Sequence, residues 1–371
     1  MRLTLVIHSL FSGGAERVMS TMANYWAAKG WEITLLAMCG NEVTPFYTLD
    51  SKVTYIPLGI AINSANKIIG VWNNLWRIKI MKDAITRSNP DIIISFMDTT
   101  NIIVLMATRG LSIPVVVSER IEPSRSPLGR VWKKLRKLTY SYADKIVVQS
   151  NSAFSYFLDT LKINTCIIIP NPVLLPPKVQ NISDKVVGNY SLMAMGRFEI
   201  QKGFDILLKA FAKIKDTYPK WKLIILGDGS LRFELESLRD ELGLSNQVYL
   251  PGKTNNPYEF LREANIFVMS SRYEGFPNAL CEAMACGLPV ISTDCPSGPR
   301  EIIRDGVDGI LVPSENVYAL ATAMERLMSN EQERQHLAAN ASDVTQRFSL
   351  EKVMGMWEKL IEEVIKERKK I

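Results

Sequence analysis

Two glutamates that lie eight residues apart are the most specific chemical feature of the sequence. Glu274 follows an expected strand at 266–269, and Glu282 lies inside an expected helix at 278–285. A carboxylate at Glu274 can accept hydrogen bonds from sugar hydroxyls, and Glu282 can accept both hydroxyls of a ribose. Backbone amides at the start of the helix can bond phosphate or sugar oxygens.

The alternative is that Glu274 caps a turn and Glu282 is a solvated helix residue. Small and apolar residues surround Glu282 in the helix, however, and a carboxylate in such a setting needs a polar partner. These neighbours are Ala279, Leu280, Ala283, Met284 and Ala285.

Two cations that lie five residues apart follow another expected strand. Arg197 and Lys202 belong to the glycine-bounded segment 196–203, after a strand at 191–195 and before a helix. Open α/β sheets bind ligands at the carboxyl ends of their strands. Arginine and lysine beside a helix start suit a diphosphate leaving group. The alternative is a pair of solvated surface cations.

Gly13 and Gly14 join the first expected strand to a helix. Glycines at such a place let the backbone approach an anion closely. The spacing is not that of the G-x-G-x-x-G dinucleotide motif. A tight strand-to-helix turn explains these glycines equally well.

The elements that position these residues alternate between strand and helix. In the first half the expected strands are 3–7, 32–37, 92–96, 115–118 and 145–149, and the expected helices include 15–29 and 78–87. Alternation of this kind indicates a parallel sheet covered by helices on both faces.

A proline-bearing polar stretch divides the chain after an expected strand at 165–170. The alternation then restarts, with strands at 191–195, 222–226, 247–250, 266–269, 290–292 and 309–312 and helices at 203–216, 231–242, 278–285 and 317–328. We therefore expect two doubly wound α/β domains, 1–172 and 190–349, joined by a linker at 173–189. The amphipathic helix in 350–371 is a candidate to pack back on the first domain.

Composition excludes several classes of protein. A chain of 371 residues is longer than a single hydrophobic core usually supports. Its apolar runs are shorter than the ~20 residues that a membrane-spanning helix needs. Five cysteines without C-x-x-C spacing and two distant histidines argue against a disulfide framework or a metal site, so no metal or cofactor is expected. The net charge of +6 fits phosphate-bearing or anionic partners but is too small to indicate nucleic-acid binding. The first residues do not form a signal peptide, which predicts a cytoplasmic protein.

A basic amphipathic stretch at 127–138 is a candidate membrane or acceptor contact. Such a pattern is typical of a helix on an anionic membrane, where each cation contributes ~1 kcal/mol to membrane binding. The cations could also bind a lipid-linked diphosphate. The alternative is a first-domain helix with a solvated basic face. Trp72 and Trp76 in a second stretch suit either a membrane interface or the core. The basic stretch contains the cations Arg130, Lys133, Lys134, Arg136 and Lys137 and the apolar residues Val131, Trp132, Leu135 and Leu138.

Several motifs together resemble glycosyltransferase family 4, whose members are retaining enzymes with a GT-B fold. The pair Glu274 and Glu282 fits the Glu-x7-Glu motif of that family. The segments 196–203, 273–282, 284–291 and 306–312 are similar to it, and 13–16 carries a weaker likeness in the first half. The resemblance implies two facing Rossmann-like, doubly wound domains with an interdomain cleft.

The resemblance also implies a role for each matching residue. Arg197 and Lys202 would hold the donor diphosphate and stabilise its departing charge, and Glu274 would contact the donor sugar. These three are the catalytic candidates. Glu282 would bind the ribose, and Gly14 would let the first-domain loop close on phosphate or acceptor. The other expected donor contacts are Gly227, Gly252, Lys253, Phe276, Pro277, Asn278, Ala279 and Leu280.

One position departs from the family pattern. Many members carry a histidine after the fourth first-domain strand, where this sequence has Glu119 or Arg120. The segment 118–120 is similar to members that extend glycans on polyprenyl diphosphate. His8, at the end of the first strand, is either a cleft residue or a packed core histidine. The expected acceptor-side contacts are His8, Gly13, Glu119, Arg120, Arg130, Lys133, Lys134 and Lys137.

The expected protein is a metal-independent hexosyltransferase that uses a nucleotide-diphosphate sugar, with UDP as the favoured nucleotide. Its expected acceptor is a glycan on polyprenyl diphosphate, handled at the inner face of the membrane in polysaccharide or glycan assembly. No nucleic-acid partner is expected. Two alternatives stay open: an epimerase or a GDP- or ADP-sugar transferase with the same fold, or a non-catalytic nucleotide-sugar-binding subunit.

Overall fold

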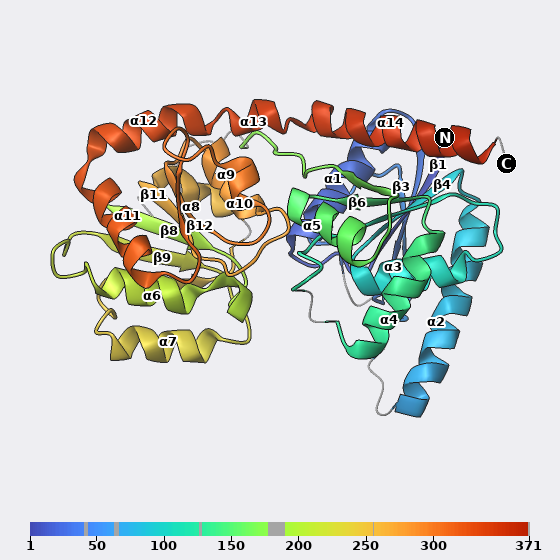
Figure 1. The fold of residues 1–371 in the computed structure, drawn as a ribbon, viewed down its shortest axis with the longest axis horizontal. Coiled ribbons are helices and arrows are strands. Elements are labelled where there is room, and N and C mark those ends of the chain that lie inside the picture. The colour runs from blue at the N-terminus through green and yellow to red at the C-terminus, as the bar shows by residue number, and fades with distance from the viewer. Residues whose placement is uncertain (41–43, 63–66, 126–127, 177–189, 255, 370–371) are drawn as a thin grey trace. The chain divides into compact units, whose positions relative to one another are not determined.

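The computed structural model describes the chain except for residues 41–43, 63–66, 126–127, 177–189, 255 and 370–371 (Figure 1). The chain forms two compact units. Unit 1 comprises Met1–Asn171 and Val353–Ile371, and unit 2 comprises Pro172–Lys352. The polypeptide therefore passes between the units twice. Most of the expected linker, residues 177–189, lies outside the described part.

Unit 1 contains a 7-stranded parallel sheet with the strand order β3-β2-β1-β4-β5-β6-β7. The strands are β1 (Arg2–Ile7), β2 (Glu32–Ala37), β3 (Val53–Pro57), β4 (Ile92–Phe96), β5 (Val115–Ser118), β6 (Lys145–Val148) and β7 (Cys166–Ile168). All five residues of β4 are buried, as its continuous apolar run predicts. The sequence did not predict β3, an edge strand in which only Val53 is buried.

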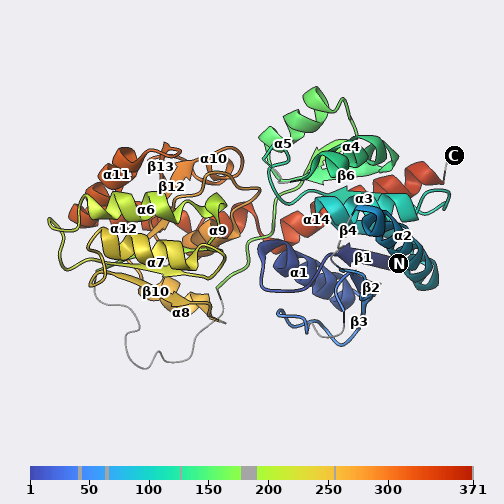
Figure 2. The same ribbon diagram turned by 90° about the horizontal axis from the view of Figure 1, so that it is seen from below.

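Helices cover both faces of this sheet. Figures 1 and 2 show α2, α3 and α4 together on one face and α14 on the opposite face. The helices of unit 1 are α1 (Gly14–Ala28), α2 (Lys67–Ser88), α3 (Asp98–Ala107), α4 (Arg130–Thr139), α5 (Asn151–Ser155) and most of α14 (Leu350–Arg368). The structure extends α2 well beyond the predicted helix at 78–87.

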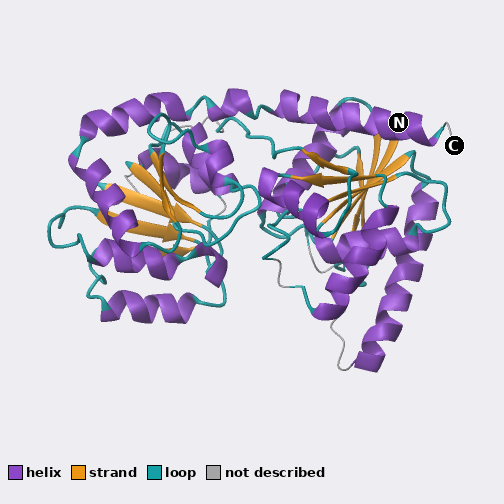
Figure 3. Ribbon diagram, in the orientation of Figure 1, coloured by secondary structure: helices purple, strands orange, loops and turns teal. Residues whose placement is uncertain are grey.

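Unit 2 contains a 6-stranded parallel sheet with the order β10-β9-β8-β11-β12-β13. Its strands are coloured orange in Figure 3. The strands are β8 (Ser191–Met195), β9 (Lys222–Leu226), β10 (Val248–Gly252), β11 (Ile266–Met269), β12 (Val290–Asp294) and β13 (Ile310–Pro313). The helices are α6 (Phe204–Ala212), α7 (Arg232–Glu241), α8 (Pro257–Glu263), α9 (Asn278–Ala285), α10 (Pro299–Ile302), α11 (Val317–Ser329), α12 (Glu331–Ala341) and α13 (Val344–Arg347). Every strand expected in this half is present, with bounds that differ by at most a few residues.

The terminal helix α14 contributes its apolar stripe to unit 1. Trp357 is fully buried, and its ring lies 6.4 Å from the ring of Phe96 at the end of β4. Lys29 donates to Glu358 at 2.7 Å, and Arg368 donates to Asp144 at 2.6 Å. Among the described residues, none of the helices combines the length and apolarity that crossing a bilayer requires.

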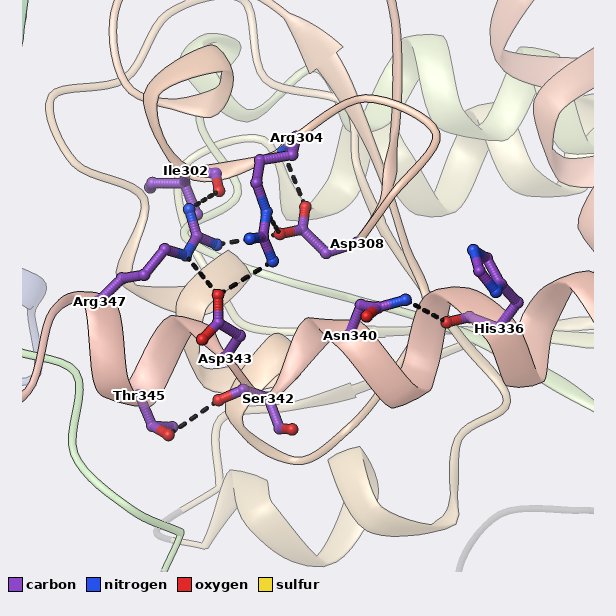
Figure 4. Close-up of polar contacts among 9 residues, drawn as sticks. All are labelled: Ile302, Arg304, Asp308, His336, Asn340, Ser342, Asp343, Thr345 and Arg347. Atoms are coloured by element: carbon purple, nitrogen blue, oxygen red, sulfur yellow. Dashed lines mark hydrogen bonds and ion pairs between the residues drawn. The ribbon is translucent and has the colours of Figure 1, made fainter.

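An ion-pair network fixes α13 to the turn before β13 (Figure 4). Asp308, fully buried, accepts hydrogen bonds from the backbone and side chain of Arg304, each at 2.7 Å, and from Arg347 at 3.1 Å. Asp343 pairs with the same two arginines at 3.0 and 3.4 Å. These bonds assign Asp308, in the glycine-containing motif at 306–312, a structural role.

Candidate active site

Each sheet reverses its strand order at one point, and open α/β sheets bind ligands at the carboxyl ends of the strands beside such a point. In unit 2 the reversal falls between the neighbouring strands β8 and β11. The segment after β8 contains Arg197 and Lys202, and the segment after β11 contains Glu274. The three catalytic candidates therefore lie where this fold places its ligands.

An ion pair joins these two segments. Lys202 Nζ donates to Glu274 Oε1 at 2.6 Å, and Ser271 Oγ donates to the same oxygen at 2.6 Å. The side chains of Glu274 and Lys202 are 5% and 17% exposed, so the pair is shielded from water. The lysine crosses Gly196, where a Cβ would lie 3.0 Å from Lys202 Cδ. Glycine at position 196 thus leaves Lys202 a path to Glu274.

A second glycine sets the distance between the segments. Gly203 has a φ of +61°, and a Cβ there would overlap the carbonyl oxygen of Ser270. The Ser270 hydroxyl also donates to the Lys202 carbonyl at 2.9 Å. The backbones of the two segments are therefore in direct contact.

The turns that contain the expected donor contacts Gly227, Gly252 and Lys253 lie along the same edge of the sheet. Gly227 N donates to Gly252 O at 2.9 Å, and a Cβ on Gly227 would overlap the Gly196 carbonyl oxygen. Gly196, Gly227 and Gly252 thus stand side by side where β8, β9 and β10 end. The side chains of Arg197 and Lys253 are exposed at this edge.

Helix α9 begins at Asn278, as the sequence predicts, and contains the half-buried Glu282. One expected contact needs correction. The Leu280 amide donates to the Pro277 carbonyl at 3.1 Å, and the Leu280 side chain is fully buried, because the first turn of the helix closes on Pro277. Leu280 is therefore engaged within the protein, whereas Asn278 and Ala279 stand half-buried at the helix start. Phe276 and Pro277, which directly precede the helix, are buried.

In unit 1 the strand order reverses between β1 and β4. His8 directly follows β1, and its side chain is exposed, so the packed-core alternative for this histidine is wrong. Gly13 and Gly14 lie in the same segment, and α1 begins at Gly14. A Cβ on Gly13 would overlap the carboxylate of Glu16, so glycine makes room for that side chain.

Glu119 and Arg120 lie at the end of β5 and have partners inside unit 1. Glu119 is 2% exposed and accepts a short hydrogen bond from the Tyr140 hydroxyl. Burial, followed by the charge of a nearby carboxylate, raises the pKa of Glu119 to about 7. The Arg120 guanidinium lies 3.5 Å from the Phe96 ring centroid and donates to Asn171 at 2.6 Å. The acceptor-side expectation did not anticipate these internal partners.

The basic stretch forms α4, but one of its cations faces inward. Arg136 is 1% exposed and donates to the Tyr156 hydroxyl at 2.9 Å, because its position on the helix faces the unit's interior. Val131 and Leu138, conversely, are 69% and 64% exposed among the outer cations. The outer face of α4 is therefore both basic and apolar.

The amino-terminal half of α2 is also apolar on its surface. Trp72 is 69% exposed, Leu75 54% and Trp76 43%, which rejects the core alternative for the two tryptophans. Helices α2 and α4 lie on the same face of the sheet (Figures 1 and 2). We define the α2/α4 surface as Trp72, Leu75, Trp76, Arg130, Val131, Lys133, Lys134, Lys137 and Leu138, all exposed.

Sequence reasoning missed the residues that support Lys202 and Glu274. Ser271 shares Glu274 with the lysine, and Gln201 donates to the Tyr273 carbonyl at 3.0 Å. Arg272 bonds several groups of the opposite segment. Their position directly after the buried strand β11 was a usable signal, because residues at that end of a strand border the ligand site.

Comparisons with known proteins identify the family of the chain. A family model of glycosyltransferase family 4 matches residues 12–175, and one of glycosyl transferases group 1 matches residues 178–344. The GalNAc-α-(1→4)-GalNAc-α-(1→3)-diNAcBac-PP-undecaprenol α-1,4-N-acetyl-D-galactosaminyltransferase of Campylobacter jejuni is 30% identical over 98% of this chain and 99% of its own length.

Solved structures agree with the fold. A sucrose-phosphate synthase from Thermosynechococcus elongatus has a TM-score of 0.85 at 18% identity, covering 98% of this chain and 99% of that one. HepE of Anabaena in complex with UDP has a TM-score of 0.77 at 17% identity, covering 98% and 100%. These likenesses confirm the expected two-domain α/β GT-B architecture.

Proposed function

Because the chain belongs to glycosyltransferase family 4, and is thus a glycosyltransferase, we propose that it transfers a hexose from a UDP-sugar to a glycan on polyprenyl diphosphate, with retention. The observation that carries this proposal is the shielded ion pair between Lys202 and Glu274 at the strand-order reversal of unit 2. A cation and a carboxylate held side by side there can bind different parts of the donor. The cation attracts the diphosphate, and the carboxylate accepts hydrogen bonds from the sugar.

The proposed chemistry follows from where charge develops. Breaking the anomeric C–O bond leaves negative charge on the departing diphosphate and positive charge on the sugar. Lys202 and the exposed Arg197 stabilise the departing charge, together with the amino-terminal end of α9. Glu274 holds the sugar hydroxyls, and Glu282 accepts the hydroxyls of the ribose.

Retention requires that the acceptor attack from the face that the diphosphate leaves. In this proposal the leaving phosphate accepts the proton of the attacking hydroxyl, so no side chain acts as a dedicated base. Two cations of the protein neutralise the diphosphate, so the reaction proceeds without a divalent metal. Transfer should accordingly continue at an undiminished rate in excess EDTA.

The nature of the two substrates draws on the relatives. The Campylobacter enzyme acts, by its name, on an undecaprenyl-diphosphate-linked glycan, and HepE binds UDP. The α2/α4 surface suits the anionic inner face of a cell membrane, because it combines four exposed cations with exposed tryptophan, leucine and valine. We place the protein there, as a peripheral cytoplasmic enzyme.

The test pairs donor binding with product analysis. A panel of UDP-, GDP- and ADP-sugars is screened by thermal shift, since a donor at 100 times its Kd adds about 2.7 kcal/mol. The best donor is then incubated with a polyprenyl-diphosphate-linked glycan, and the anomeric configuration of the product is read by NMR. A stabilising UDP-sugar and an α-linked product from an α-linked donor support the proposal. Free epimerised nucleotide sugar, or binding without any turnover, would establish one of the two alternatives.

A further inference from the structure

We infer that Arg272 is the positioning residue that holds Lys202 against Glu274 before any substrate binds. The guanidinium of Arg272 contacts the segment that contains Lys202, although Arg272 itself belongs to the segment that contains Glu274. For its kinetic consequences the inference rests on the function proposed above. Its structural content is independent of that function.

The bonds of Arg272 occupy both its side chain and its backbone. Nη1 donates to the Ile200 carbonyl at 2.8 Å, and the fork formed by Nη1 and Nη2 binds both carboxylate oxygens of Asp205 at 2.8 Å. Its Nε donates to Glu315 at 3.0 Å, and its backbone amide donates to the Gln201 carbonyl at 2.8 Å. Bidentate arginine–carboxylate pairs are strong and directional.

These partners lie on both sides of Lys202. Ile200 and Gln201 precede it in the short 3-10 helix that ends at Lys202, and Asp205 lies in the first turn of α6. Glu274 is only two residues beyond Arg272 in the sequence. The side chain of Arg272 thus bonds residues on both sides of Lys202 in the sequence. Glu274 follows Arg272 closely along the backbone.

The guanidinium of Arg272 bonds groups around the ion pair rather than the ion pair itself. Its guanidinium is taken up by Asp205, Glu315 and the Ile200 carbonyl, while the Glu274 carboxylate is bonded by Lys202 and Ser271. Supporting bonds of this kind keep a catalytic pair within the tolerance that chemistry demands. A misplacement of about 1 Å at a reacting group can cost about 100-fold in rate.

A matched arginine separates positioning from general stability. The side chains of Arg272 and Arg239 are 22% and 24% exposed, and Arg239 also pairs with an aspartate, Asp240, at 2.8 Å. Arg239 lies in α7, and its side chain pairs with Asp240 rather than with the described residues of either site segment. Arg239→Ala therefore removes a similar side chain and ion pair from unit 2 without disturbing the site segments.

The experiment compares Arg272→Ala, Arg272→Lys and Arg239→Ala in the full-length protein. We expect Arg272→Ala to lower kcat at least tenfold, with the Kd for UDP changed less than threefold, and Arg239→Ala to keep kcat within twofold of the wild type. A lysine can keep one bond to Asp205 but cannot also reach the Ile200 carbonyl. Arg272→Lys should therefore give an intermediate kcat, and it replaces the alanine variant should that variant fail to fold.

A second readout does not depend on turnover. Acetic anhydride labels lysines at rates that depend on their accessibility and ion pairing, and mass spectrometry quantifies labelling at Lys202. Labelling should be slow in the wild type and in Arg239→Ala, and several-fold faster in Arg272→Ala. Unchanged labelling of Lys202 in folded Arg272→Ala would overturn the inference. A wild type without transfer activity on any donor would refute only the proposed function.

Discussion

The buried polar groups at the carboxyl ends of the two sheets differ in how completely they are hydrogen-bonded. In unit 2 the Lys202 ammonium and the Glu274 carboxylate bond each other, and Ser271 supplies a further bond. In unit 1, Glu119 Oε2, Glu122 Oε2 and Arg136 Nε and Nη1 are buried without a hydrogen-bond partner among the described residues. Buried polar atoms without a partner lower stability.

The buried ion pair of unit 2 is thus fully hydrogen-bonded, whereas unit 1 contains buried polar atoms that have no partner among the described residues. Variants in unit 2 should therefore change rate more than stability. Variants in unit 1 should change stability, pH response and membrane binding more than the chemical step.

The largest effect is expected from Lys202→Met, which removes the ammonium but keeps most of the side-chain volume. We expect kcat to fall roughly 100- to 1,000-fold, because stabilisation of the departing charge is lost. Transfer of radiolabelled sugar measures the change. Lys220→Met, at an exposed lysine of the same unit, is the control and should retain wild-type kcat. A loss below tenfold for Lys202→Met would contradict the assigned role.

Next in size is the pH response of Glu119. Its pKa is about 7 in the folded protein against an ordinary value of 4.5, so the folded state keeps a proton that the unfolded chain releases earlier. Stability should therefore fall as pH rises from about 4.5 to about 7, by about 3 kcal/mol in all. Glu119→Gln should remove this slope in urea unfolding measured at pH 5 and pH 8. The exposed control Glu351→Gln should keep it, and an unchanged slope in Glu119→Gln would disprove the assignment.

A smaller effect distinguishes two glycines with the same backbone conformation. Gly203 and Gly243 have φ of +61° and +66°, but only at Gly203 would a Cβ meet the neighbouring segment, at Ser270. Gly243→Ala should lose about 1 kcal/mol of unfolding free energy through backbone strain, and Gly203→Ala should lose more, because its Cβ also overlaps the Ser270 carbonyl oxygen. Only Gly203→Ala should also lower kcat, by about tenfold, because it pushes the Lys202 segment away from Glu274. Equal kcat values for the two variants would show that this close approach does not matter.

The smallest effect concerns the α2/α4 surface. Lys133→Gln and Lys137→Gln should each weaken binding to vesicles with phosphatidylglycerol by about fivefold, corresponding to ~1 kcal/mol per cation. Co-sedimentation measures the binding. Lys220→Gln in unit 2 should have no effect, and phosphatidylcholine vesicles should bind all forms equally weakly. Loss of transfer to a short, water-soluble acceptor in the same variants would instead place these lysines in the chemical step.

The sequence predicted the strands and helices whose patterns are strong. The run Ile92–Phe96 has no polar interruption except Ser95, and it forms β4 with every residue buried. Helix α9 was placed correctly from its apolar spacing. The helix at Glu331–Ala341 was not foreseen, because Leu337 and Ala341 are its only buried residues and no apolar stripe marks it.

Prediction of the site stopped where partners are distant in sequence. The resemblance led us to expect Lys202 and Glu274 at one donor site, but the ion pair between them joins positions 72 residues apart and follows only from the order of β8 and β11. Arg272 was missed for the same reason. Arg136 was assigned to the basic face because charged side chains are ordinarily exposed. Only the fold reveals that its guanidinium donates to the Tyr156 hydroxyl.

The return of the chain to unit 1 limits how the protein can be divided. A fragment that ends at Asn171 would lack Val353–Ile371, and with it the indole that packs beside Phe96. Such a fragment would expose an apolar strip of the sheet and should aggregate on expression. Supplying residues 353–371 as a separate peptide should restore its solubility, because unit 1 is encoded by two stretches of the gene that the coding sequence of unit 2 separates.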